Sequence, residues 1–149
     1  MGAFELSTIR HSASHVLAQA VLCLFPQAKL GIGPAIDDGF YYDFDLDTPL
    51  STDHLSALET EMNRIIAESQ PFKTYTLPRQ EAVNLMTQKQ QSYKVEIIND
   101  LNLDSYSFYE NGPFLDLCRG PHVDNTSQIG VIKLQKVAGA YWRGDAKNE

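Results

Sequence analysis

The spacing of apolar residues predicts a long amphipathic helix near the start of the chain, over residues 8–24. Its apolar positions lie on one stripe of a helix with 3.6 residues per turn; they are Ile9, Ala13, Val16, Leu17, Ala20 and Leu24. His11 and His15 fall on the opposite face, where their neighbours are Ala18 and Leu22 and not charged side chains. This pattern indicates a second cleft on that side of the helix. Two surface histidines on an amphipathic helix are the competing interpretation.

The rest of the pattern predicts a mixture of short strands and helices. Strands are expected at residues 29–36, 40–46, 72–77, 105–117 and 131–142, and helices at 51–69 and from Pro78 onward. Asp37-Asp38-Gly39 predicts a hairpin turn, and Asn111-Gly112-Pro113 interrupts the fourth strand. Residues 93–101 fit either a helix or a strand. We therefore predict an α+β fold, a single compact domain in which an antiparallel sheet packs against helices.

Composition and charge narrow the class of protein. The chain has 149 residues, 43% of them hydrophobic, which suffices for one domain with a sizeable core. A formal net charge of −7 argues against a general nucleic-acid binder. The charge is uneven, since residues 1–72 hold ten acids and three bases whereas residues 73–149 hold nine of each. Any contact with phosphate is therefore expected in the second half.

The two cysteines, without a secretory signal or a long apolar run, favour a reduced, cytoplasmic setting and no membrane anchor. Cys23 lies at the edge of the apolar stripe of the first helix, so it is expected to be buried and inert. Cys118 has polar and charged neighbours and is the better candidate for chemistry.

Two short motifs concentrate the residues that can bind a metal, move a proton or hold a water. They are His11-Ser12-Ala13-Ser14-His15 and Cys118-Arg119-Gly120-Pro121-His122, and each pairs two such side chains four positions apart. On a helix, this spacing places both side chains on one face. The chain has four histidines and two cysteines, so most of its metal-binding and proton-transferring groups lie in these two motifs.

Several familiar chemistries are excluded by single positions. Gly31-Ile32-Gly33-Pro34 lacks the third glycine and the following helix of a dinucleotide-binding loop. Ser12 stands where the zinc-protease motif requires glutamate, and CxxxH is too widely spaced for the CxxC pair of a zinc finger. What remains is a composite site, with groups from the first helix and from a late loop, that is similar to an open hydrolytic centre.

Five blocks of sequence resemble the editing domain, or second additional domain, of bacterial-type threonyl-tRNA synthetase. They are HSASHVLAQAV, IGPAIDDGFYYDFD, SYKVEII, FLDLCRGPHV and KLQKVAGAYWRGD, in the order that this family shows. HxxxH combined with CxxxH also occurs in alanyl-tRNA editing domains, but FLDLCRGPHV and AGAYWRGD favour the threonyl branch. The resemblance covers residues 9–149, and residues 1–8 are expected to form an N-terminal extension.

The resemblance implies hydrolysis of the ester bond of seryl-tRNA mischarged onto threonine tRNA, while threonyl-tRNA is spared. A synthetic pocket for threonine rejects serine only through one missing methyl group, worth about 1–3 kcal/mol, so a second, hydrolytic site is needed. The implied partners are the aminoacylated acceptor end of threonine tRNA and the remainder of a threonyl-tRNA synthetase. No ATP-binding motif is present in the chain, so it is not expected to charge tRNA alone.

The same resemblance implies catalytic roles for individual residues. His11 and Lys94 would form the catalytic core, with His11 orienting the ribose hydroxyl and water or relaying a proton, and Lys94 stabilising charge or positioning water. Asp116 would hold the ammonium group of the substrate, and Cys118 and His122 would be the remaining catalytic residues. Taken alone, Lys94 also fits an exposed lysine at a helix end, and Asp116 a carboxylate on a surface loop.

Substrate-binding positions are implied as well. His15 would line the pocket beside the catalytic residues and help to hold the water. Tyr42 matches an aromatic residue near the substrate, and Gly33 and Pro34 would let the backbone approach it. A tyrosine in the core and an ordinary Gly-Pro turn are the structural alternatives for these positions.

Zinc is the one cofactor that the residues suggest, without a firm prediction. His11, His15, Cys118 and His122 form a plausible tetrahedral set, but four protein ligands would leave no open position for a catalytic water. We therefore expect a metal-free site, as the resemblance to the threonyl branch implies. The alternatives are a non-catalytic module that docks the tRNA acceptor end, a zinc-binding deacylase of the alanyl type, and a small metal-binding protein unrelated to tRNA.

Overall fold

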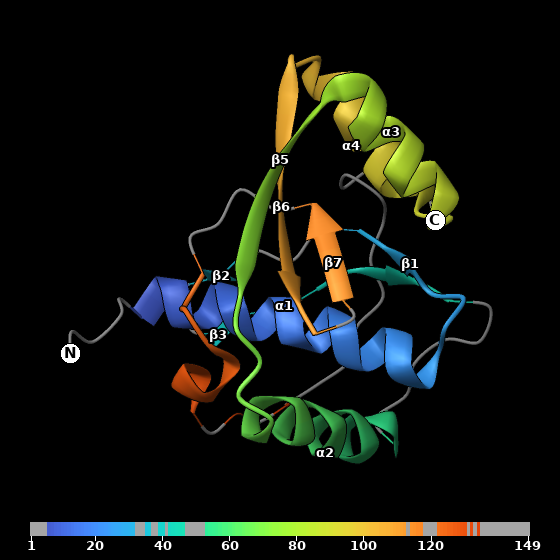
Figure 1. Ribbon diagram of the computed structural model, residues 1–149. Helices are drawn as coiled ribbons and strands as arrows, with labels where there is room; N and C mark the ends of the chain where they lie inside the picture. The colour runs from blue at the N-terminus through green and yellow to red at the C-terminus, as the bar shows by residue number, and fades with distance from the viewer. Residues whose placement is uncertain are drawn as a thin grey trace.

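The first helix, α1 (Leu6–Leu24), runs through the middle of the molecule (Figure 1). The computed structural model describes residues 6–31, 35–36, 39–40, 42–46, 53–112, 114–117, 122–130, 132 and 134. Helix α2 (Asp53–Ala67) lies along one side of α1, and the main sheet rises from another side. The last residue of α1 lies two positions before Pro26, whose ring is incompatible with a helix interior.

Apolar residues cover α1 on two opposite faces. The larger cluster joins it to α2 and contains Ala13, Val16, Ala20 and Val21 of α1 and Leu58, Met62, Ile65 and Ile66 of α2. On the other face, Ala18 packs against Leu30 and Phe114. Apolar contacts therefore bury this face of the helix as well, and the second cleft expected on the histidine side stays a prediction.

The main sheet is antiparallel, with strand order β5–β6–β7. Strand β5 (Lys73–Pro78) pairs with β6 (Ser105–Asn111), and β6 pairs with β7 (Phe114–Leu117). The chain reverses between Asn111 and Phe114, where Gly112 has a φ of +54° that other residues rarely adopt. The predicted interruption of this strand is therefore the turn of a hairpin.

Helices α3 (Arg79–Gln88) and α4 (Ser92–Leu101) lie together at one end of this sheet (Figure 1). The cluster that joins them to β6 contains Ala82, Met86, Ile98, Tyr106 and Phe108. The ambiguous stretch of residues 93–101 is thus a helix, because its apolar side chains complete this cluster.

Two small two-stranded antiparallel sheets follow α1, and the strands of the second lie between those of the first in the sequence. Strand β1 (Lys29–Leu30) pairs with β4 (Phe44–Asp45), and β2 (Ala35–Ile36) pairs with β3 (Gly39–Phe40). The pairing expected between residues 29–36 and 40–46 is therefore present, in shorter pieces. A 3-10 turn, η1 (Thr126–Ile129), was not predicted and packs against both α1 and α2.

The predicted fold class, an antiparallel sheet packed against helices, is confirmed. The prediction that Cys23 is buried is wrong, because the buried positions of α1 end at Val21, and Cys23 and Leu24 are exposed. Apart from residues 132 and 134, which are not in a strand, the strand expected at 131–142 lies outside the described residues. None of the helices that the structure describes combines the length and the apolar character needed to cross a membrane.

Replacing Leu58 by alanine should lower the free energy of unfolding by about 2–5 kcal/mol, since a cavity would open between α1 and α2. Leu58 is 1% exposed, whereas Leu101 at the end of α4 is 54% exposed. Leu101→Ala is therefore the matched control, with an expected change below about 0.5 kcal/mol. Urea denaturation checks both values, and equal losses would contradict the described core.

Candidate active site

Three histidines meet beside α1. His11 and His15 lie one turn apart on this helix, and His122 comes from the segment that precedes η1. The ring centroid of His122 lies 4.8 Å from that of His11 and 5.0 Å from that of His15. The structure thus brings together the histidines of the two motifs. His15 is 2% exposed, so the surface interpretation is wrong for this residue.

Ser12 ties the late segment to α1. Its hydroxyl donates to the carbonyl of Thr8 at 2.9 Å and accepts from the backbone N–H of Val123 at 2.9 Å. Ser12 is fully buried, so its hydroxyl satisfies a backbone group that has no access to water. Because Val123 adjoins His122, this contact sets where the third histidine lies. From the sequence alone, Ser12 was informative only because it stands where the zinc-protease motif requires glutamate.

The hairpin of β6 and β7 forms the wall opposite the histidines. Its register places four side chains on one face: Tyr109, Asn111, Phe114 and Asp116. The ring of Tyr109 stacks on His122 at 4.1 Å, and the ring of Phe114 meets His15 edge-on at 4.7 Å. The sequence analysis did not single out Tyr109 and used Asn111 only as a turn signal, although the two lie two positions apart on the predicted strand, the spacing that places side chains on one face.

Burial keeps the three imidazoles neutral at physiological pH. Loss of solvation lowers the pKa of His15 to about 4 and that of His122 to about 2. The pKa of His11 is lowered as well, mainly by burial; Asp116 opposes this shift and Lys94 adds to it. Each neutral ring can accept a proton or a hydrogen bond, which is the state that general-base catalysis requires.

A buried ion pair completes the site. Lys94 Nζ lies 3.3 Å from Asp116 Oδ1, and the two residues are 4% and 3% exposed. Tyr42 donates its hydroxyl to Asp116 Oδ2 at 2.6 Å, and its ring centroid lies 5.4 Å from Lys94 Nζ. The interpretations of Lys94 as an exposed lysine and of Asp116 as a surface carboxylate are therefore wrong. The pair sets a positive and a negative group beside neutral imidazoles.

Three side-chain hydrogen bonds hold Lys94 in place by fixing the start of α4 against the paired strands β1 and β4. Gln91 accepts from the N–H of Leu30 at 2.7 Å and donates to the carbonyl of Ala28 at 3.3 Å. Tyr93 donates to Asp45 Oδ2 at 2.6 Å. Lys94 follows directly, so α4 directs it toward β7. Nothing in the sequence singled out Gln91, because its partners are distant backbone groups.

Comparisons with known proteins identify relatives of this chain. A family model described as the threonyl and alanyl tRNA synthetase second additional domain matches residues 106–149. The threonine–tRNA ligase of Clostridium acetobutylicum is 53% identical over 143 residues, which are 95% of this chain and 22% of the ligase. The predicted family resemblance is confirmed.

Other threonine–tRNA ligases match the same portion of the chain. Those of Acetivibrio thermocellus and Nitratidesulfovibrio vulgaris are each 52% identical, over 94% and 96% of this chain. The chain spans about a fifth of the length of these ligases, 22% in each case. The similarity is thus to one part of a larger enzyme.

The remaining predicted positions concern the metal and the pocket walls. Cys118, Gly33 and Pro34 lie outside the residues that the structure describes. Within the described part of the chain, no three His, Cys, Asp or Glu side chains are arranged to hold a metal ion. The described residues thus do not form a zinc centre by themselves. The role of zinc stays a prediction.

Breaking the buried ion pair on one side should destabilise the fold strongly. Lys94→Met or Asp116→Leu alone should lower the free energy of unfolding by about 3–5 kcal/mol, because the other charge stays buried without compensation. The double variant should lose clearly less free energy of unfolding than the sum of the losses of the two single variants. Urea denaturation of the four proteins gives the coupling, and additive losses would contradict the pair. Asp104→Asn, in a solvent-exposed pair with Arg79, is the control and should change nothing measurable.

The buried histidines should make the fold less stable as the pH falls from 7 to 5. Below the ordinary pKa of 6.5, unfolded His15 and His122 take up protons, whereas the folded forms with pKa values of about 4 and about 2 do not. Each histidine should therefore cost up to about 1.4 kcal/mol per pH unit in this window. The pH dependence of urea denaturation should be shallower for His122→Phe. Identical slopes would refute the burial argument.

Proposed function

We propose that this chain is an editing deacylase, which hydrolyses the ester of seryl-tRNA formed on threonine tRNA and leaves threonyl-tRNA intact. The observation that carries the proposal is the convergence of three neutral histidines with a buried Lys94–Asp116 pair. The supporting comparison is the identity of about half of the residues with one part of threonine–tRNA ligases.

Ester hydrolysis needs a proton acceptor and a positive group near the developing oxyanion. His11 is the proposed proton acceptor, because burial lowers its pKa and leaves its ring neutral. It would orient the terminal ribose hydroxyl and the attacking water or relay a proton between them. Lys94 would stabilise the negative charge that develops in the transition state.

Asp116 is the proposed anchor for the ammonium group of the seryl residue. It already meets Lys94 and accepts from Tyr42. An ionised carboxylate offers about four acceptor positions, so a third donor can be accommodated. Tyr42 would then border the bound aminoacyl group. In this arrangement, Asp116 holds the substrate and keeps Lys94 in place at the same time.

The remaining residues are proposed to shape the pocket. His15 and His122 would line it and hold the water, together with Cys118. Gly33 and Pro34 would let the backbone approach the aminoacyl group. Selectivity would come from a pocket that admits serine and excludes one further methyl group, an effect of about 10–200-fold for binding alone.

The proposal extends to the larger protein that the relatives represent. We propose that the chain works as part of a threonine–tRNA ligase, where it receives the acceptor end of threonine tRNA after a charging error. The even charge balance of residues 73–149, against an excess of acids before them, makes the second half the expected side for phosphate contacts.

The test is the release of labelled serine from seryl-tRNA carrying the threonine anticodon. The intact chain should release serine much faster than threonine. His11→Ala should slow the release by about 10²–10⁴-fold, since it removes the proton acceptor. Lys94→Met should slow it by about 10²–10³-fold through lost charge stabilisation.

Matched controls are His54→Ala on α2 and Lys89→Ala after α3, which lie outside the site. Both should retain wild-type rates. No release by the intact chain would contradict the deacylase and favour the docking module. Activity that a chelator abolishes and zinc restores would favour the zinc-dependent alternative.

A further inference from the structure

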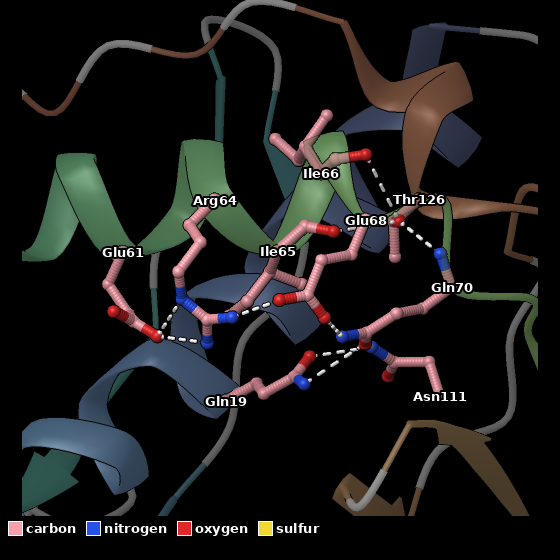
Figure 2. A network of polar contacts seen from close by, with 9 residues as sticks. All are labelled: Gln19, Glu61, Arg64, Ile65, Ile66, Glu68, Gln70, Asn111 and Thr126. Carbon is pink, nitrogen blue, oxygen red and sulfur yellow. Dashed lines mark hydrogen bonds and ion pairs between the residues drawn. The ribbon is translucent and has the colours of Figure 1, made fainter.

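A chain of polar side chains connects the surface of α2 to His15 in the site. Figure 2 shows most of it: Glu61, Arg64, Glu68, Gln70, Gln19 and Asn111. Asn111 and Gln19 are 1% and 3% exposed, whereas the side chain of Glu68 is 46% exposed. Every contact along this chain of side chains joins a donor to an acceptor. The orientation of one side-chain amide therefore determines the orientation of the next.

The direction is set at the outer end. Glu68 is held by the guanidinium of Arg64, and its other oxygen accepts from Gln70 Nε2 at 2.8 Å. An ionised carboxylate can only accept hydrogen bonds, so the NH₂ group of Gln70 must face outward. The carbonyl oxygen Oε1 of Gln70 therefore faces the interior.

That oxygen orients the next two amides. Gln70 Oε1 accepts from Gln19 Nε2 at 3.1 Å and from Asn111 Nδ2 at 2.8 Å (Figure 2). Asn111 Nδ2 also donates to Gln19 Oε1 at 2.5 Å. Both hydrogens of the Asn111 amide are thus used on this side. Its oxygen Oδ1 is left facing His15 Nε2 at 2.7 Å.

We propose that this amide relay fixes His15 as the tautomer with its hydrogen on Nε2, which makes Nδ1 a hydrogen-bond acceptor in the site. Asn111 Oδ1 cannot donate, so the hydrogen of this contact must come from Nε2. Nδ1 is buried and has no hydrogen-bond partner among the described residues. An O–H donor, from a water or a hydroxyl, is the group that this atom can receive.

The backbone of Gln70 is held in place on one side, and the turn between β6 and β7 approaches its side chain on the other. Its backbone N–H donates to Thr126 Oγ1 at 2.9 Å, and its carbonyl accepts from the N–H of Thr126 at 2.9 Å. On the other side, a Cβ added at Gly112 would lie 2.9 Å from Gln70 Oε1. The relay is therefore enclosed by η1 and by the turn between β6 and β7.

Asn111, Gln70 and Gln19 are positioning residues, because they act on the site only through His15. This inference rests on the proposed function only for the identity of the donor: in an editing deacylase, it is the attacking water or a hydroxyl of the aminoacyl-tRNA. His15 would then orient that group by accepting from it, while His11 and Lys94 carry the chemistry.

The test is nitrogen NMR of the ¹⁵N-histidine-labelled chain at neutral pH, with the His15 signals assigned by their loss in His15→Gln. Wild type should show the Nε2–H tautomer. In Glu68→Gln, Arg64 competes for the single remaining side-chain oxygen, which turns an NH₂ group toward Gln70 and favours the reversed relay. The Nδ1–H tautomer should therefore appear. Glu61→Gln is the matched control, since Glu61 also binds Arg64 but does not contact Gln70.

An Nδ1–H tautomer in wild type, or no change in Glu68→Gln, would overturn the relay. Under the proposed function, Glu68→Gln should also lower kcat/KM for seryl-tRNA by about tenfold, the equivalent of 1.4 kcal/mol, and Glu61→Gln should not. The two proposals fail separately. The expected tautomers without deacylation would reject only the editing function, and deacylation with the wrong tautomer would reject only the relay.

Discussion

Helix α1 is covered on two opposite faces, and the candidate site depends on this packing. Helix α2 buries one face, and Ala18 packs against Leu30 and Phe114 on the other. His15 lies within this second contact, where burial lowers its pKa to about 4. On a helix with one exposed face, the same imidazole would be partly protonated near pH 6.5. The covering of α1 is therefore what turns a common HxxxH spacing into a set of neutral proton acceptors.

The buried ion pair follows a different physical logic. Removing Lys94 and Asp116 from water is costly, and a buried pair of this kind contributes little net stability compared with apolar residues. Its effect on the site is electrostatic: Asp116 raises the pKa of His11 and His15 and Lys94 lowers it. These two influences oppose each other, so burial decides that the histidines are neutral. The site can therefore hold a full positive charge without protonating its bases.

Buried and half-buried hydroxyl and amide side chains hold the separate segments of the site in register. Ser12 joins α1 to the segment of His122, Gln91 joins α4 to β1, and Gln70 joins the end of α2 to β6. Each of them contacts groups that are distant in the sequence, and Ser12 and Gln91 satisfy backbone N–H groups inside the protein. Such contacts have direction as well as energy, which is why the orientation of Gln70 has consequences at His15.

Local patterns in the sequence determined the helices, the turn and the set of side chains that can carry out chemistry. The 3.6-residue period predicts α1 and α2, Asn111-Gly112-Pro113 predicts the turn, and the spacing of His11 and His15 places both on one helix face. Only the tertiary structure decided which side chains are buried and which residues they contact. Cys23 is exposed, although the apolar stripe predicts it to be buried, and Lys94 is buried, although taken alone it fits an exposed lysine at a helix end. The hydrophobic period shows which residues share a face of one helix or strand, but not which other element that face contacts. The hydrogen bond between His15 Nε2 and Asn111 Oδ1 joins residues 96 positions apart, so only the packing of α1 against β6 could create it.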